Sequence, residues 1–349
     1  MILAPFIEIN QPIGTFYITK LSPENIIMCT EVKRRINHSE GIQRALDRNR
    51  VAEISNYCSD PDATFPTPII IAVDSAKVEI ENNYIKFYSS EKIGEIIDGQ
   101  HRIEGFKKVK NKDKFELPVI FMFDLTAEEK AYVFSVINSN QKPVPKSLIY
   151  DLFDLSSKRS PFKTAHEIAR GLNVDEQSSF YGRLKMLGKK ETSNSSLSQG
   201  TFVHHLLRLM SRKPEKDTID LKNERILCDD DKLPLRYYFI HQDDEVIYII
   251  IRNYFNAVSR VFIKEWNNSD EYILSRSTGY GALMRVFPVV YHIGDTNDDL
   301  SEEFFFNIFM QIKNKFYENY SFTSEEFASN EQEQNRLAKI ILKLIKESQ

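Results

Sequence analysis

The stretch EIIDGQHRIEGFKKV, residues 95–109, decides the fold of the first part of the chain. An apolar run of strand type ends at Ile97, Gly99 makes a turn, and Ile103 and Phe106 follow at helical spacing. The pattern predicts a strand, a tight turn and a helix of about ten residues. The polar residues at this joint need a further explanation, because a plain connection requires only a glycine and a cap.

These polar residues suit a site for a phosphate group. A helix that starts directly after a strand presents unpaired backbone N–H groups and the positive end of its dipole. Gly99 lets a ligand approach the backbone, Arg102 is a bidentate phosphate donor, and His101 is a donor that titrates near neutral pH. Asp98 would cap the helix, hold His101 or Arg102, or help to bind a metal. An ordinary turn with a capping Asp98 and a solvated first helical turn fits the same letters, so both interpretations stay open.

Strands and helices alternate up to about residue 145. Residues 14–22 and 65–73 have strand patterns, and residues 41–58 have near-helical spacing. Residues 78–88 alternate on both sides of Asn82-Asn83, which indicates a hairpin. A buried strand is predicted at residues 116–125. Thr126 and Glu129 then form a capping box for a further helix, which two prolines end.

The second half has a different pattern of apolar residues, which predicts a mainly α-helical domain. Aromatic-rich apolar stripes predict helices over residues 247–266, 279–293, 301–320 and 330–348. Polar loops are predicted near residues 188–200 and 211–234. The expected fold class is α+β, with a mixed α/β domain at residues 1–145 and an α-helical domain at residues 146–349.

Composition is that of an ordinary globular protein. Of the 349 residues 42% are hydrophobic, which is enough for two cores, and a formal net charge of −4 argues against a global basic field. Cys29, Cys58 and Cys228 are too widely separated for a disulfide framework or a cysteine metal site. No apolar run approaches about 18 residues, and no signal peptide is evident, so we expect a cytoplasmic protein without a membrane span.

The five letters DGQHR, residues 98–102, are the signature of the DGQHR-domain family, and the chain resembles that family over most of its length. Further blocks stand in the expected order: GIQR (41–44), FPTPIIIAV (65–73), FSVINSNQKPV (134–144) and STGYGALMRVF (277–287). The family includes DndB-like proteins of bacterial DNA phosphorothioation systems. The resemblance therefore implies a protein that associates with DNA.

DGQHR domains are in turn similar to the ParB/sulfiredoxin fold, in which this strand–turn–helix binds a nucleotide or contributes to DNA-related chemistry. Sulfiredoxins carry a catalytic cysteine just before the His-Arg pair, and this chain has Gln100 there. Cysteine–phosphoryl chemistry is therefore not expected. Phosphate binding through the backbone and Arg102 is still expected.

The candidate site residues form two groups. Those predicted to bind a nucleotide or phosphate are Gln43, Arg44, Gly99, Gln100, His101, Arg102, Asn138, Asn140 and Gln141. Those predicted to bind DNA are Arg48, Arg50, Lys142 and Lys146. The two arginines also suit a solvated helix face with Asp47 as counter-charge, and the amides also suit a helix end and its turn.

Two other features of the sequence are expected to be structural. His204 and His205 are adjacent on a predicted helix and face different directions, so no metal site is predicted there. The aromatic stripe over residues 302–312 is expected to be core.

Three function hypotheses follow. The first is a DNA-associated accessory or regulatory protein of a bacterial DNA-modification or defence system, with DNA and other proteins of its operon as partners. The second is an NTPase or nuclease in which Asp98 and His101 act on a phosphoester, with a nucleoside triphosphate and Mg²⁺ as cofactors. It suffers from a shortage of nearby carboxylates. The third is a protein-interaction scaffold in which the DGQHR turn is structural.

Overall fold

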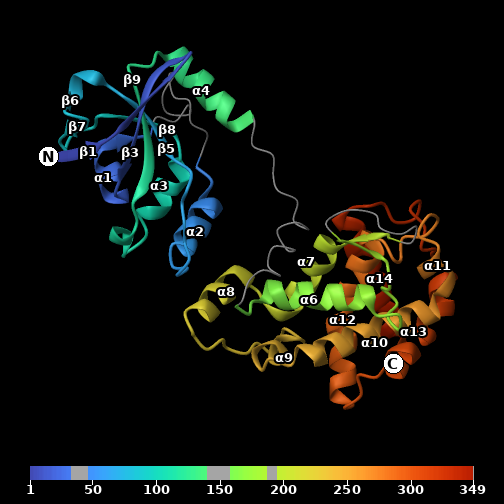
Figure 1. Cartoon of the computed structure of the whole chain (residues 1–349). Coiled ribbons are helices and arrows are strands. Elements are labelled where there is room, and N and C mark those ends of the chain that lie inside the picture. The colour runs from blue at the N-terminus through green and yellow to red at the C-terminus, as the bar shows by residue number, and fades with distance from the viewer. Residues whose placement is uncertain (33–45, 140–157, 187–194, 349) are drawn as a thin grey trace. The chain divides into compact units, whose positions relative to one another are not determined.

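The protein consists of two compact units, Met1–Pro143 and Val144–Gln349 (Figure 1). The computed structural model describes residues 1–32, 46–139, 158–186 and 195–348. The first unit is mixed α/β and the second is α-helical, which confirms the predicted fold class. The predicted domain boundary after residue 145 is close to this division, in a segment outside the described residues. None of the described helices is long and apolar enough to cross a bilayer.

The α/β unit contains two sheets and four described α-helices. Its strands are β1 (Ile2–Pro5), β2 (Ile7–Gln11), β3 (Gly14–Leu21), β4 (Thr30–Glu31), β5 (Ile69–Val73), β6 (Glu79–Glu81), β7 (Tyr84–Phe87), β8 (Gly94–Asp98) and β9 (Leu117–Phe123). Its helices are α1 (Pro23–Cys29), α2 (Arg48–Tyr57), α3 (Gln100–Phe106) and α4 (Ala127–Ser139).

The larger sheet has the strand order β2-β3-β9-β5-β8-β4. β5 runs parallel to β9 and antiparallel to β8, so the strand that leads into the DGQHR turn lies beside the buried strand β5. The register between β5 and β8 shifts at Ile70 and Ile71, which pair with Asp98 and Ile96. Bulges of this kind bend a strand and redirect the residues that follow it.

Apolar residues at alternate positions of the central strands form the core of this unit. Ile69, Ile71 and Val73 of β5 are buried with Val119 and Phe121 of β9. This is the pattern of a strand with one face packed on helices. Helix α3 packs closely on α2 because Gly105 has no side chain: a Cβ there would lie 2.6 Å from Cγ2 of Ile54.

Two local predictions in this unit are confirmed. Asn82 and Asn83 have φ of 49° and 63°, the left-handed conformations that a two-residue hairpin between β6 and β7 requires. The capping box also forms, because the Thr126 N–H donates to Glu129 Oε2 at 2.8 Å and the Glu129 N–H to Thr126 Oγ1 at 3.2 Å. The hydrogen bonds to Glu129 lower the pKa of its carboxyl.

The second unit is a group of helices around an aromatic core. The described helices are α6 (Pro161–Val174), α7 (Gln199–Met210), α8 (Pro214–Lys222), α9 (Arg236–Ile240), α10 (Asp244–Val261), α11 (Ile263–Asn267), α12 (Ser277–Thr296), α13 (Glu302–Tyr317) and α14 (Glu331–Lys346). Strands β10 (Leu184–Lys185) and β11 (Leu197–Ser198) form a short parallel pair. The four helices predicted in the C-terminal part are present, with a break at Phe262 between α10 and α11.

Aromatic rings fill this core. Phe255 and Tyr280 stack with centroids 5.3 Å apart, and Phe180 meets Phe255 edge-on at 4.9 Å. The buried Tyr280 hydroxyl donates to the carbonyl oxygen of Phe202 at 3.1 Å, which satisfies its polar end. Phe305 and Phe309 are fully buried, as the prediction for residues 302–312 requires.

The predicted loops are partly wrong. Residues 187–194 lie outside the described residues, but β11 and the start of α7 occupy residues 197–200. In the segment 211–234, residues 214–222 form helix α8, which starts with Pro214 in its first turn. A loop was predicted here because the segment contains few apolar residues. The helix needs few of them, since α8 buries only one hydrophobic side chain, that of Ile219.

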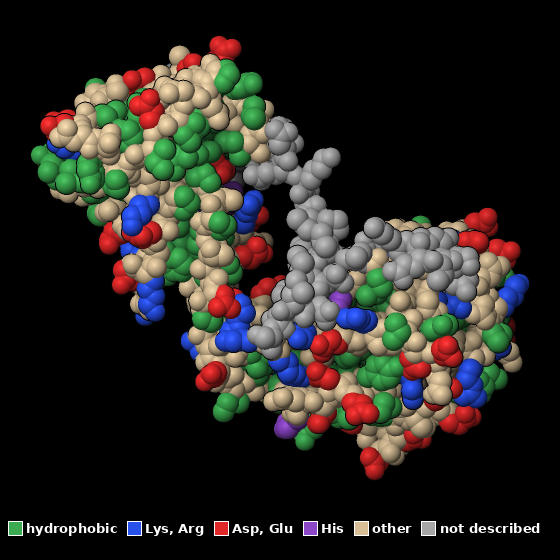
Figure 2. Space-filling model, viewed as in Figure 1, with side chains coloured by type: hydrophobic (Ala, Val, Ile, Leu, Met, Phe, Trp, Pro, Cys, Tyr) green, Lys and Arg blue, Asp and Glu red, His purple; other side chains and the backbone are tan. Residues whose placement is uncertain are grey.

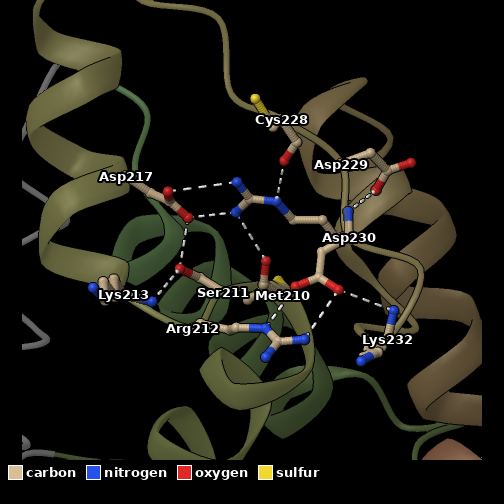
Figure 3. Close-up of polar contacts among 10 residues, drawn as sticks. Met210, Ser211, Arg212, Lys213, Asp217, Cys228, Asp229, Asp230 and Lys232 are labelled. Atoms are coloured by element: carbon tan, nitrogen blue, oxygen red, sulfur yellow. Dashed lines mark hydrogen bonds and ion pairs between the residues drawn. The ribbon is translucent and has the colours of Figure 1, made fainter.

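A buried arginine holds the rest of this polar segment in place (Figure 3). The guanidinium of Arg236 forms an ion pair with the carboxylate of Asp217 on α8, and the two side chains are 8% and 13% exposed. Its Nε also donates to the Cys228 carbonyl at 3.0 Å, and Nη1 donates to the Met210 carbonyl at 3.1 Å. Ser211 Oγ completes the set by donating to Asp217 Oδ2 at 2.6 Å. Four chain segments are thus joined at one charge pair.

The two adjacent histidines have opposite environments. His204 is exposed, and His205 is buried with its ring 5.7 Å from that of Tyr280. Burial, reinforced by the positive charges of Arg285, His204 and Arg208, lowers the pKa of His205 to about 3. His205 is therefore a neutral core residue.

Replacing Asp217 should strongly destabilise the helical unit. We expect Asp217→Ala to lower the free energy of unfolding by about 3–5 kcal/mol, because Arg236 is left buried without its carboxylate. Urea denaturation measures this loss. Asp231→Ala, at an exposed position on the same segment, is the control and should change stability by less than about 0.5 kcal/mol. Equal effects of the two substitutions would show that the buried pair has no special weight.

His205 should make the protein less stable in mild acid. The pKa of His205 is about 3 in the folded protein and about 6.5 in the unfolded chain. Between these two values the ring is protonated in the unfolded chain and neutral in the folded protein. The contribution to stability therefore falls as the pH drops from about 6.5 towards 3, by roughly 2 kcal/mol at about pH 5. His205→Gln should reduce the difference in unfolding free energy between about pH 7 and about pH 5 by this amount. His204→Gln should leave most of that difference in place.

Candidate functional site

The DGQHR turn lies where β8 ends and α3 begins, as the sequence predicted, although α3 has seven residues and is shorter than expected. Gly99 is the N-cap of α3 and has φ of 100°, a conformation that side chains disfavour. A Cβ at Gly99 would also lie 2.4 Å from Cδ1 of Ile69. Both backbone conformation and packing therefore require glycine at this position.

Arg102 connects the turn to the segment that precedes β5. Its Nη1 donates to the carbonyl oxygen and to Oγ1 of Thr67, the latter at 2.9 Å, and Nη2 donates to the Pro68 carbonyl at 2.8 Å. Nη2 also contacts Asp98 Oδ2 at 3.3 Å. The Arg102 side chain is 15% exposed. Its terminal nitrogens thus bind the protein itself, and Arg102 holds the turn in place.

Burial is the main cause of a lowered pKa at Arg102. The carboxylate of Asp98 opposes this shift, and the nearby positive charge of Arg50 adds to it. The effect of Arg50 shows that the start of α2 lies close enough to the turn for the two charges to interact.

His101 joins these two segments directly. The backbone N–H of Asp47 donates to Nε2 of His101 at 3.2 Å, across 54 positions of sequence. Nε2 is therefore an acceptor, and a neutral ring with this bond carries its proton on Nδ1. Asp47 is also the N-cap of α2, and its Oδ1 accepts from the backbone N–H groups of Asn49 and Arg50. The sequence suggested Asp47 only as a counter-charge for the arginines, although an aspartate before a helix is a capping signal.

Arg48 and Arg50 are exposed in the first turn of α2. Neither of them forms an ion pair with any residue that the structure describes. The structure thus places two available guanidinium groups at the start of α2, next to the DGQHR turn. Their predicted contact with DNA stays a prediction.

The side chain of Gln100 points into the protein. It is 5% exposed, and its Oε1 is buried without a hydrogen-bond partner among the described residues. A buried acceptor without a donor costs about 1–3 kcal/mol, which is unusual in a folded protein. Within the described part of the turn, this atom is the one buried side-chain N or O atom without a hydrogen-bond partner.

The remaining predicted site residues cannot be placed. Gln43, Arg44, Asn140, Gln141, Lys142 and Lys146 lie outside the described residues, and so does the side chain of Asn138 in α4. The contacts of Arg102 with Thr67 and Pro68 had no local signal, because a carbonyl acceptor is present at every residue. Among the described residues, no group of three or more His, Cys, Asp or Glu side chains is arranged to hold a metal ion.

The contact between Gly99 and Ile69 can be tested by a double-mutant cycle. We expect Gly99→Ala to destabilise the protein by about 1–3 kcal/mol through backbone strain, with a further cost of about 1–3 kcal/mol from the clash. Ile69→Val removes Cδ1, so Gly99→Ala should cost less in that background. Gly14→Ala is a control for strain alone, because Gly14 has φ of 135° and no atom within 4 Å of the added Cβ. Additive effects of Gly99→Ala and Ile69→Val in urea denaturation would contradict the packing argument.

Comparison with known proteins gives a family. No curated protein matches the chain. A solved structure, C-terminally truncated ParB of Caulobacter crescentus complexed with CTP-gamma-S, is similar at 10% identity, over 66% of this chain and 91% of that chain. Its TM-score is 0.29, too low to support a conclusion about the present fold or ligand. The family model of DndB, described as DNA-sulfur modification-associated, matches residues 4–345. The chain therefore belongs to the DndB family.

Proposed function

We propose that the protein is a DNA-associated accessory or regulatory component of a DNA-sulfur modification system. In this proposal a phosphate-bearing ligand binds where the DGQHR turn meets the start of α2. Its setting is the cytoplasm, and its partners are DNA and other proteins of the modification or defence operon. The observation that carries the proposal is the hydrogen bond from the Asp47 N–H to His101, because it brings two exposed arginines to the turn.

The charges at this corner favour an anion. Arg48 and Arg50 lie at the positive end of the ten-residue helix α2, where the helix dipole adds to their field. Arg50 also lowers the pKa of Arg102, which means that the two cations repel each other. A bound phosphate would relieve that repulsion. Arginine suits this role because its planar group binds phosphate oxygens in pairs.

Gln100 has a structural place in this proposal. Its side chain is 5% exposed and its Oε1 is buried inside the unit, so it is not offered to a ligand at the exposed start of α2. The proposed ligand is therefore defined by its phosphate, carried either by a free nucleotide or by DNA.

Arg102 has a different task in this proposal from Arg48 and Arg50. Its bonds to Thr67, Pro68 and Asp98 keep the turn in the shape that His101 and Gly99 need. It is a positioning residue, and a direct contact with phosphate stays a prediction.

Removing the two exposed arginines should weaken DNA binding in a way that depends on salt. We expect Arg48→Ala/Arg50→Ala to reduce the slope of log K against log salt for a short duplex by up to about 2, since each lost phosphate contact removes about 0.9. Fluorescence anisotropy over a salt series measures this slope. A thermal-shift series with nucleotides tests the same variant for a free ligand.

Lys110→Ala is the matched control, because Lys110 is exposed beyond the other end of α3 and carries the same charge. It should change the slope little. If the double variant and Lys110→Ala bind duplex and nucleotides as the unchanged protein does, the proposed corner is not the binding site.

A further inference from the structure

The helical unit contains a pocket of about 540 Å³ that the proposed function does not use. Its walls come from the residues before α6, the end of α8, the segment that follows α8, and the end of α9. Figure 2 shows Lys and Arg side chains on the side of this unit where α8 and the start of α6 lie in Figure 1. A volume of this size suits a ligand as large as a nucleotide.

The charged residues that line the pocket are mainly basic. Lys158, Arg159, Lys222, Arg225 and His241 line it, against one acidic residue, Glu224. Both arginines of the lining are already oriented. Arg159 pairs with Asp244 and lies 4.2 Å from the ring centroid of Phe239, and Arg225 donates to Asp220 at 3.0 Å.

The wall formed by residues 224–227 is anchored at both ends. Arg236 fixes the Cys228 carbonyl to α8 through its ion pair with Asp217 (Figure 3). At the other end of this wall the Arg225 N–H donates to the Asp220 carbonyl at 2.9 Å. The pocket is thus formed before any ligand arrives, which reduces the entropy lost on binding.

Beside the charged residues, the pocket has an apolar and aromatic surface formed by Ile226 and the His241 ring. The side chain of Ile226 is 96% exposed at the pocket wall. The ring of His241 stacks on Tyr237, with centroids 4.1 Å apart and planes at 30°. Tyr237 is 53% exposed, and His241 Nδ1 bonds to the Tyr237 carbonyl at 2.8 Å, which fixes the ring. Such a stack offers a face to a nucleobase.

We propose that this pocket binds a nucleoside phosphate. Its phosphate would lie against Lys222 and Arg225, and its base against the Tyr237–His241 stack and Ile226. The same chemistry is offered by a free nucleotide and by a nucleotide unit of a single DNA strand. The site is separate from the DGQHR turn, since the two share no residue and belong to different units.

The test uses the full chain and two fluorescent probes, a labelled nucleoside triphosphate and a labelled short single-stranded oligonucleotide. We expect Lys222→Gln/Arg225→Gln to weaken binding of at least one probe about tenfold or more. Tyr237→Ala should weaken the same probe while leaving competition by pyrophosphate unchanged, since pyrophosphate has no base. A loss with the triphosphate alone identifies a free nucleotide, and a loss with the oligonucleotide alone or with both identifies a strand or both sources.

Lys216→Gln is the matched control, because Lys216 is exposed on the same helix and does not line the pocket. It should bind both probes as the unchanged protein does. The Arg48→Ala/Arg50→Ala variant distinguishes the two sites. If it weakens binding, its change in binding free energy should add to that of the pocket variant when the four substitutions are combined. Thermal melting confirms that each variant is folded. Unchanged binding of both probes by the folded Lys222→Gln/Arg225→Gln and Tyr237→Ala variants would overturn the proposal.

Discussion

The α/β unit depends on a left-handed turn at Gly99 that one guanidinium holds closed. Gly99 has to lack a side chain because Ile69 of β5 fills the space beside it. Arg102 then binds the carbonyl oxygens of Thr67 and Pro68, at the entry to the same strand. The turn between β8 and α3 is therefore fixed to β5 on both sides. The motif that suggests a ligand site therefore also stabilises the fold of the α/β unit.

Local patterns predicted most of the fold because they encode backbone requirements. Asn82 and Asn83 tolerate the positive φ of a hairpin, and Thr126 and Glu129 satisfy the first N–H groups of α4. Helix α1 was missed although Ser22 and Pro23 are a normal start for a helix, because its apolar run is too short to show a period. Helix α8 was missed because nearly all of its surface is polar. The pair between Asp217 and Arg236 joins α8 to α9, and its partners are 19 positions apart.

The sequence allowed us to predict which residues belong to the candidate site, but not which contacts they make. The sequence indicated the turn and the arginines before α2, but it could not indicate that the Asp47 N–H and His101 meet. A hydrogen bond between a backbone group and a side chain 54 positions away leaves no pattern in composition or period. For the same reason the prediction that Arg102 clamps a phosphate took no account of the carbonyl groups that occupy it.

Four arginines of this protein thus illustrate two environments that the sequence does not distinguish. Arg102 and Arg236 are largely buried, and each is surrounded by carbonyl oxygens and one carboxylate. Such sites use most of the donors of a guanidinium, because a buried charge without partners is costly. Arg48 and Arg50 are exposed in the first turn of a helix and pair with no described acid, so their donors are available to a ligand. Burial and partners, more than membership of the DGQHR motif, therefore indicate which cations can meet a phosphate.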